Sequence, residues 1–265
     1  MSKQNFYKAR RARMRREVDE GLVLELVRAE RRLQPRLGAR KLLVRIAVAL
    51  SEAGVEIGRD RFFELLGEWD LLVPGLRSTP RTTNSRHGFR TYPNLLKLQE
   101  LCGAHEAWVC DLTYLRTLDG FVYLALVMDV FSRKIVGWHV GNTLEASGCV
   151  RAVKMAMRQL PVGAAPIHHS DRGTQYSCWQ YVCLLEGRGI VISMTEENHC
   201  YENGKAERLN GILKQEYGLG ETLRNRETAG KMVEAAVGLY NRCRPHAALG
   251  MRYPELVHRP RPVAA

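Results

Sequence analysis

The sequence predicts an α/β protein in which a mixed five-stranded sheet flanked by helices is preceded by a small all-α domain. Apolar residues recur at helical spacing in residues 17–67, whereas short strand-like runs begin at residue 108. Between these regions, residues 74–93 are rich in Pro, Arg, Thr and Ser and show little periodicity, which is typical of a linker. Charge is also unevenly shared, since residues 1–100 carry +9 of the net charge of +12.

The chain begins with a strongly basic stretch. Its first sixteen residues carry seven basic side chains, and an acid-rich helical pattern follows in residues 17–32. Such a concentration of positive charge indicates a polyanion partner whose phosphates it neutralises. We interpret the stretch as an arm along phosphates, and a frayed, solvated helix is the alternative.

Two short helices are predicted next, in residues 37–53 and residues 58–67, joined by a tight turn that contains Gly54. This is a helix-turn-helix pattern, in which the start of the second helix enters the major groove of DNA. A helical hairpin that binds nothing is the alternative. The arginines expected to face DNA are Arg40, Arg45, Arg59 and Arg61.

The larger domain contains strand and helix patterns in a definite order. Three strands joined by tight turns come first, and helices then alternate with strands. Thr143 is the expected amino cap of the first of these helices. The predicted strands are residues 108–115, 121–130, 133–140, 167–170 and 190–194, and the predicted helices are residues 143–160, 179–186 and 226–242. This order is that of the ribonuclease-H-like fold, with helices covering both faces of the sheet.

Residues 199–217 predict a further helix with two distinct faces. Its polar positions are four, three and four residues apart, so they form one stripe at 3.6 residues per turn. The opposing apolar stripe would pack on the core. The polar stripe consists of Asn203, Glu207, Asn210 and Lys214, and the apolar stripe of Ala206, Leu209 and Leu213.

Three acidic residues have the spacing of a metal site. Asp111 and Asp171 lie at or near the ends of strand-like runs with 59 residues between them, and Glu207 follows after another 35. Magnesium prefers carboxylate oxygens, and two-metal phosphoryl transfer needs acidic groups from separate elements that converge. Asp129 and Glu202 are the competing acids, and Asp129 is expected to bond the turn that follows it.

The segments HSDRGTQY, ENGKAERLNGILKQEY and YNRCRPHAALG carry a family resemblance. At these residues the chain resembles the Asp-Asp-Glu transposase and retroviral-type integrase superfamily. More narrowly, it is similar to the transposases of the IS-three group of bacterial insertion sequences, as the product of their downstream open reading frame. The resemblance covers nearly the whole chain and implies a ribonuclease-H-like integrase catalytic core.

This resemblance implies a DNA transposase that catalyses metal-dependent DNA strand cleavage and strand transfer. Asp111, Asp171 and Glu207 would hold Mg²⁺, with Mn²⁺ as a substitute. The implied partners are double-stranded DNA at the element ends and the target, further copies of the chain on that DNA, and an upstream frameshift-fusion product. A catalytically decayed DNA-binding relative and a ribonuclease-H-like nuclease are the alternatives.

Further DNA contacts are expected from Lys205, Lys214 and Arg242. In the carboxy-terminal signature, we expect a packing role for Tyr240 and a phosphate role for Arg242 or Arg244.

Composition restricts the compartment. No run approaches eighteen apolar residues, and the basic amino terminus is not followed by the apolar core of a signal peptide, so we expect a soluble, cytoplasmic, nucleoid-associated protein with no membrane partner. Seven cysteines form no CxxC pair, which indicates free thiols. His168 and His169 have no partner at metal spacing and are assigned to the Asp171 loop. The expected divisions are 1–36 (basic arm and helix), 37–73 (helix-turn-helix-like domain), 74–93 (basic linker), 94–225 (catalytic core) and 226–265 (carboxy-terminal helix and tail).

Overall fold

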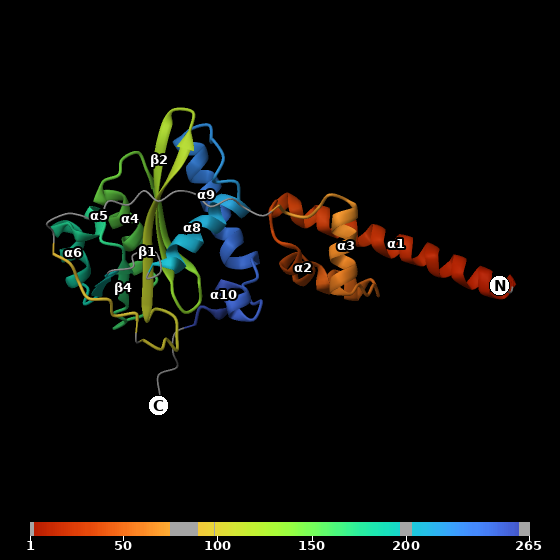
Figure 1. The fold of residues 1–265 in the computed structure, drawn as a ribbon. Helices are drawn as coiled ribbons and strands as arrows, with labels where there is room; N and C mark the ends of the chain where they lie inside the picture. Colours follow the sequence, from red (N-terminus) through yellow and green to blue (C-terminus); the bar gives the residue numbers. More distant parts are fainter. Residues whose placement is uncertain (1–2, 75–89, 98, 197–202, 260–265) are drawn as a thin grey trace. The chain divides into compact units, whose positions relative to one another are not determined.

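The computed structural model describes residues 3–74, 90–97, 99–196 and 203–259 (Figure 1). The chain divides into two compact units, Met1–Leu76 and Arg77–Ala265. Most of the basic linker segment, residues 75–89, lies outside the described residues. None of the described helices has both the length and the apolar character needed to cross a membrane.

The amino-terminal unit consists of α1 (Lys3–Leu33), α2 (Ala39–Glu52) and α3 (Arg59–Glu68). The turn between α2 and α3 contains Gly54 at φ +67°, a left-handed conformation that glycine adopts without steric cost. Only the second half of α1 contributes to the core of this unit, through Val23, Leu24 and Val27. The other buried apolar residues come from the later segments: Leu37, Leu42, Ile46, Leu50, Val55, Phe62, Leu65 and Leu66.

The second unit is built on the predicted mixed five-stranded sheet, which the structure confirms. Its strands are β1 (Ala107–Thr117), β2 (Gly120–Asp129), β3 (Ile135–Gly141), β4 (Ile167–Ser170) and β5 (Val191–Met194). Their spatial order is β3-β2-β1-β4-β5. The first three strands pair antiparallel, and β4 pairs parallel with both β1 and β5.

Helices cover both faces of this sheet (Figure 1). Alternate β1 residues serve the two cores, because successive side chains of a strand point to opposite faces. Val109 packs in the core beneath α8 (Gly204–Glu216) and α9 (Arg226–Cys243), whereas Trp108 and Cys110 pack in the core beneath α4 (Ala146–Met157) and α6 (Trp179–Glu186). The short helix α5 (Thr174–Ser177) precedes α6.

Two details of this unit depend on close packing. Helix α4 begins after Glu145, whose extended backbone makes it the amino cap, so the prediction of Thr143 as the cap is wrong. Gly137 of β3 faces α4 so closely that a Cβ atom there would collide with the Ala152 carbonyl. A glycine is therefore required where this helix crosses the strand.

The carboxy-terminal signature has a structural role. Asn241 of α9 accepts a hydrogen bond from Ile135 N (2.9 Å) and donates to Ile135 O (3.0 Å), so it pairs with the backbone of β3 as a neighbouring strand would. Tyr240 is buried in the core. The chain then forms η1 (Ala247–Leu249), turns at Gly250, which has φ +61°, and continues into α10 (Pro254–Val257).

Candidate active site

Strand register brings Asp111 and Asp171 together. In the parallel pair β1 and β4, Ala107 lies opposite Ile167 and Val109 opposite His169. Continued by two residues, this register sets Asp171, the first residue after β4, beside Asp111. Two acids separated by 59 residues therefore meet because their strands are neighbours running in the same direction.

The loop after β4 holds the Asp171 carboxylate in place. Gly173 N donates a hydrogen bond to Asp171 Oδ1 at 3.0 Å. A Cβ atom on residue 173 would lie 2.9 Å from the same oxygen, so any larger residue there would require the Asp171 carboxylate to shift. Arg172 extends to the end of β5, where its Nε donates to Thr195 O at 2.7 Å.

The polar stripe of α8 lies along β1. Asn203 Nδ2 donates to Cys110 O (3.2 Å), and Asn210 Nδ2 donates to Asp111 Oδ2 (2.6 Å). One turn further, Lys214 Nζ donates to Thr113 Oγ1 at 2.7 Å and lies 4.6 Å from the centre of the Tyr114 ring. The opposite stripe is buried as predicted, with Ala206, Leu209 and Leu213 at most 2% exposed. The position of α8 against β1 therefore sets the distance between Glu207 and Asp111.

Electrostatics link the three acids. Burial raises the pKa of Asp111 to about 7, and the nearby carboxylates of Asp171 and Glu207 add to the effect. Hydrogen bonds from Leu112 N and Asn210 oppose it, because they favour the charged form. Glu207 itself is exposed in the first turn of α8.

The donor set fits a divalent cation. Three carboxylates from a strand, a loop and a helix act on one another with a net repulsion, which a hard cation would relieve. Among the described residues, no group of three or more His, Cys, Asp and Glu side chains stands at metal-binding spacing. The assignment of a divalent-cation site therefore rests on two points: all three side chains supply carboxylate oxygens, and the charges of Asp171 and Glu207 raise the pKa of Asp111.

The two histidines before Asp171 lie in β4 and not in the loop to which we assigned them. Both are fully buried. His168 Nε2 hydrogen-bonds with the Tyr181 hydroxyl (2.8 Å), and His169 Nδ1 hydrogen-bonds with Ser193 Oγ (2.9 Å). Burial lowers the pKa of His168 to about 3, so the ring is neutral. The two histidines therefore connect β4 to α6 and β5, and in this way they support the strand that leads to Asp171.

The competing acid Asp129 has structural partners. Its Oδ1 accepts hydrogen bonds from Ser132 N (2.7 Å) and Ser132 Oγ (2.6 Å), and its Oδ2 accepts one from His105 N (2.7 Å). Burial alone would raise the pKa of Asp129, but hydrogen bonds from His258, Ser132 and His105 outweigh burial and lower it. Glu202, the other competing acid, lies outside the described residues.

The predicted DNA-contact residues have different surroundings. Arg45 donates two hydrogen bonds to the Glu30 carboxylate, and Arg61 pairs with Glu20, Glu64 and Glu68. Arg59 pairs with the neighbouring Asp60. Three further members of the set are exposed: Arg40, Lys205 and Arg242.

Arg244 is not available to a phosphate. It is 2% exposed, and its Nε and Nη2 each donate to the Glu216 carboxylate at 2.7 Å. Its Nη1 hydrogen-bonds with His246 Nε2 at 2.9 Å. The structure thus corrects the expected phosphate role of this arginine, because burial and an ion pair at the end of α8 occupy its donors.

Two residues next to the acids have contacts that sequence reasoning missed. We placed Asn210 on the polar stripe but gave it no partner, and we did not consider Thr113. The signal for Thr113 was the period of two in a strand, which places it on the same face as Asp111. No comparable signal joins Asn210 to Asp111, since 99 residues separate them.

Strand order, helices on both faces, and acids in the middle of β1 (Asp111, which the sequence had suggested near a strand end) and just after the neighbouring β4 (Asp171) define the ribonuclease-H-like class of polynucleotidyl transferase cores. Residues 103–200 and residues 188–254 each match a family model described as an integrase core domain. The chain is 36% identical over 238 residues to the insertion element IS600 uncharacterized 31 kDa protein of Shigella sonnei, a match that covers 89% of this chain and 86% of that protein.

A second relative agrees with this assignment, and a solved structure agrees with the fold. The chain is 34% identical over 171 residues to transposase InsF for insertion sequence IS3A of Escherichia coli (strain K12), and the match covers 64% of this chain but only 59% of that transposase. The fold resembles a chain of the simian T-cell lymphotropic virus intasome, with a TM-score of 0.53 at 16% identity over 82% of this chain and 72% of that chain. This chain belongs to the IS3 (IS-three) family of insertion-sequence transposases.

Proposed function

We propose that this chain cuts DNA at the ends of an insertion element and joins the freed 3′ ends to a second strand, using divalent cations held by Asp111, Asp171 and Glu207. The observation that carries the proposal is the convergence of the three acids: strand register sets Asp171 beside Asp111, and Asn210 of the helix that carries Glu207 bonds Asp111 Oδ2 at 2.6 Å. Mg²⁺ is the proposed ion and Mn²⁺ its substitute. When bound, the ions would activate the attacking water or 3′ hydroxyl and stabilise the leaving oxygen.

The chain's own residues prepare this site. Asn210 holds one oxygen of Asp111, and Gly173 N holds one oxygen of Asp171. Glu207 approaches from α8, which the contacts of Asn203 and Lys214 hold along β1. Burial lowers the pKa of Lys214, and the nearby Asp111 carboxylate opposes this by favouring the charged ammonium. We propose that this ammonium binds a DNA phosphate beside the acids. Lys205, Arg40, Arg59 and Arg242 are also proposed to bind DNA.

The proposed partners are double-stranded element ends, target DNA and at least one further copy of the chain. Transposition needs two ends held together, which a symmetric assembly provides. An upstream frameshift-fusion product is a further proposed partner.

Strand transfer by the purified full chain tests the proposal. Labelled candidate ends are incubated with Mg²⁺ or Mn²⁺, and wild type is compared with Glu207→Gln and with Glu234→Gln, a matched change of an exposed glutamate on α9. Joined products should disappear for Glu207→Gln and persist for Glu234→Gln. A second readout is independent of activity: Mn²⁺ should raise the melting temperature of wild type and of Glu234→Gln more than that of Glu207→Gln.

Other outcomes would identify the alternatives. Metal-dependent cleavage without joining, with and without the upstream product, would favour a nuclease. DNA binding with neither reaction and no metal-dependent change in melting would favour a decayed transposase.

A further inference from the structure

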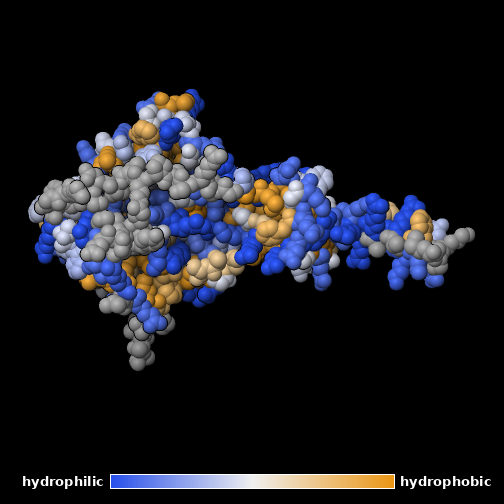
Figure 2. Space-filling view, viewed as in Figure 1, coloured by the Kyte–Doolittle hydropathy of each residue, from blue (hydrophilic) through white to orange (hydrophobic). Residues whose placement is uncertain are grey.

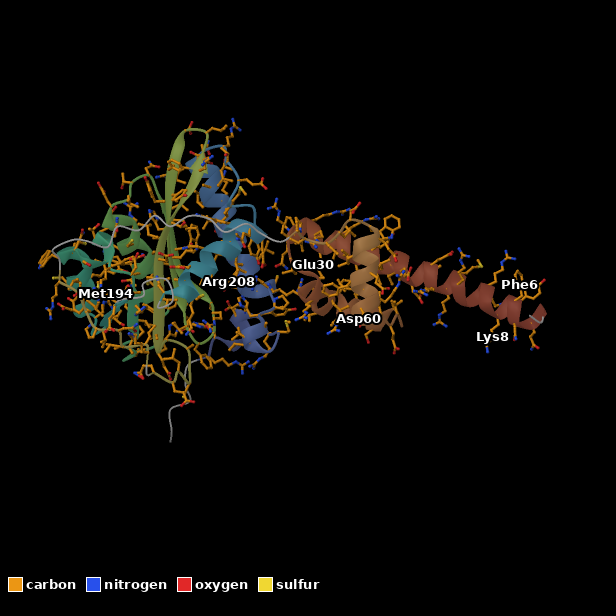
Figure 3. The ribbon with its side chains drawn as sticks, viewed as in Figure 1. Phe6, Lys8, Glu30, Asp60, Met194 and Arg208 are labelled. Carbon is orange, nitrogen blue, oxygen red and sulfur yellow. The ribbon has the colours of Figure 1, made fainter. Side chains whose placement is uncertain are left out.

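The described side chains in the first half of α1 lie outside the core of their own unit. Every described side chain in residues 4–18 is exposed, and burial begins only with Val23 and Leu24. Figures 1 and 3 show this half as a helix that projects away from α2 and α3, with Phe6 and Lys8 near its end. These residues therefore form a long helical surface that the fold of the unit does not use.

Basic side chains surround this helix on all sides. At 3.6 residues per turn, the six described basic positions leave no angular gap wider than about 100°. Only two of them pair with acids, Arg13 with Glu17 and Arg16 with Glu20. The six are Lys8, Arg10, Arg11, Arg13, Arg15 and Arg16, and Figure 2 shows the described surface here as mostly hydrophilic.

Charge on every side restricts the partner. A helix that lay along one row of phosphates, or on an acidic protein surface, would need a single basic face. The major groove of DNA is about 12 Å wide, accepts a helix about 10–12 Å in diameter, and has phosphates along both walls. A helix inside it has anions on several sides at once, which matches the distribution of these six side chains.

A narrow apolar stripe occupies the one wide gap between the basic positions. Tyr7, Met14 and Val18 are 59%, 57% and 71% exposed. They lie within about 40° of one another around the helix axis. Apolar side chains contact thymine methyl groups on the floor of the major groove, so the stripe has a partner there while the basic sides meet the walls.

We propose that residues 4–18 of α1 lie in the major groove of double-stranded DNA and form the main DNA-binding element of the amino-terminal unit. The segment is about 22 Å long, enough to follow roughly six base pairs. The expected reading helix, α3, is less suited to this role, because Arg61 is paired with three glutamates and Arg59 with Asp60. This binding is independent of the metal chemistry proposed above.

Charge removal tests the proposal in the full chain. Arg10→Gln, Arg11→Gln and Arg15→Gln together keep good helix formers at exposed positions. Binding of a labelled duplex should weaken roughly tenfold or more, and the slope of log affinity against log salt should fall by about 2 to 3, since each lost phosphate contact removes about 0.9. The matched control combines Arg151→Gln and Lys154→Gln on the exposed face of α4 with Arg158→Gln at its carboxy cap, and it should bind nearly as wild type.

The groove itself is tested with modified DNA. A duplex whose cytosines carry glucosylated hydroxymethyl groups, which fill the major groove, should bind wild type as weakly as plain DNA binds the α1 variant. A duplex with netropsin in its minor groove should bind normally. Equal losses in the α1 and α4 variants, or full affinity for the glucosylated duplex, would overturn the proposal. A further outcome would also overturn it: the protein forms a dimer without DNA, and Val18→Glu dissociates this dimer but leaves DNA affinity unchanged. The apolar stripe would then bind a second copy of the chain and not DNA.

Discussion

At the scale of single residues, Asn210 shows how a neutral side chain prepares a charged site. Its amide donates to Asp111 Oδ2 at 2.6 Å and lowers the pKa of a carboxyl that burial and two nearby acids raise to about 7. Its own Oδ1 is buried without a hydrogen-bond partner among the described residues. The amide group of Asn210 therefore orients Asp111.

Asn210→Ala should weaken metal binding more than it weakens catalysis. Without the amide, the pKa of Asp111 rises further, and protons compete more strongly with Mg²⁺ near neutral pH. The Mg²⁺ concentration for half-maximal joining should increase about tenfold, and higher pH should recover part of the loss. A Mg²⁺ titration at two pH values checks this, with Gln215→Ala on the same helix as the control. A lower rate at saturating Mg²⁺ with an unchanged half-maximal concentration would contradict it.

His168 makes stability depend on pH. Its folded-state pKa is about 3 against an ordinary value of 6.5, chiefly because of burial, so the unfolded chain binds a proton that the folded chain does not. The contribution to stability is complete above pH 6.5 and is lost as pH falls toward 3. His168→Gln should reduce the slope of the unfolding free energy between these values by about 1.4 kcal/mol per pH unit. Urea denaturation at several pH values measures the slope, and an equal slope in both proteins would exclude this role for His168.

At the scale of elements, the signature after α9 holds the end of α8. Arg244 is buried, makes a two-bond ion pair with Glu216 in the last turn of α8, and lies 5.7 Å from the centre of the Tyr240 ring. Because α8 also carries Glu207, this contact helps to fix the third acid from a distance. The signature is therefore part of the structural support of the site.

Arg244→Met alone should destabilise the catalytic unit by about 3–5 kcal/mol, because it leaves the Glu216 carboxylate in a largely buried place without its partner. Adding Glu216→Met should recover most of this loss, since two apolar side chains can replace a buried ion pair. Thermal and urea denaturation of both variants check the prediction. If the double variant is no more stable than Arg244→Met, the ion pair is not the cause.

At the scale of the whole molecule, the acids and the densest basic segment belong to different parts of the chain. The acids come from β1, the loop after β4 and α8, whereas the densest basic segment is the first half of α1. Substitutions should therefore be able to change DNA affinity and strand transfer independently.

Asp171→Asn should abolish strand transfer while DNA affinity stays within about threefold of wild type, because phosphate contacts dominate affinity and the ones proposed here do not involve Asp171. Gel shift and joining assays on the same preparation test this, and Asp119→Asn in the β1–β2 turn is the matched control. Parallel loss of binding and joining would argue against Asp171 as a metal ligand.

The elements were predictable because their signals are local. Periods of two and 3.6 gave residues 167–170 as a strand and residues 179–186 as a helix, and both agree with β4 and α6. The sheet class followed from the order of these elements. The three acids could be selected by their spacing and their motifs, and their role as metal ligands stays a prediction.

Tertiary structure alone decided which distant residues touch. The bond from Asn210 to Asp111 joins residues 99 apart, and that from Arg244 to Glu216 joins residues 28 apart. Both depend on how α8 packs against β1 and α9, which no local period encodes. The sequence by itself therefore determined the fold class, the family and the candidate acids, because these depend on local pattern and motif. The pairing of arginines with glutamates, the burial of His168 and the unpacked half of α1 were decided only by packing, since burial and ion pairing depend on neighbours that are distant in the chain.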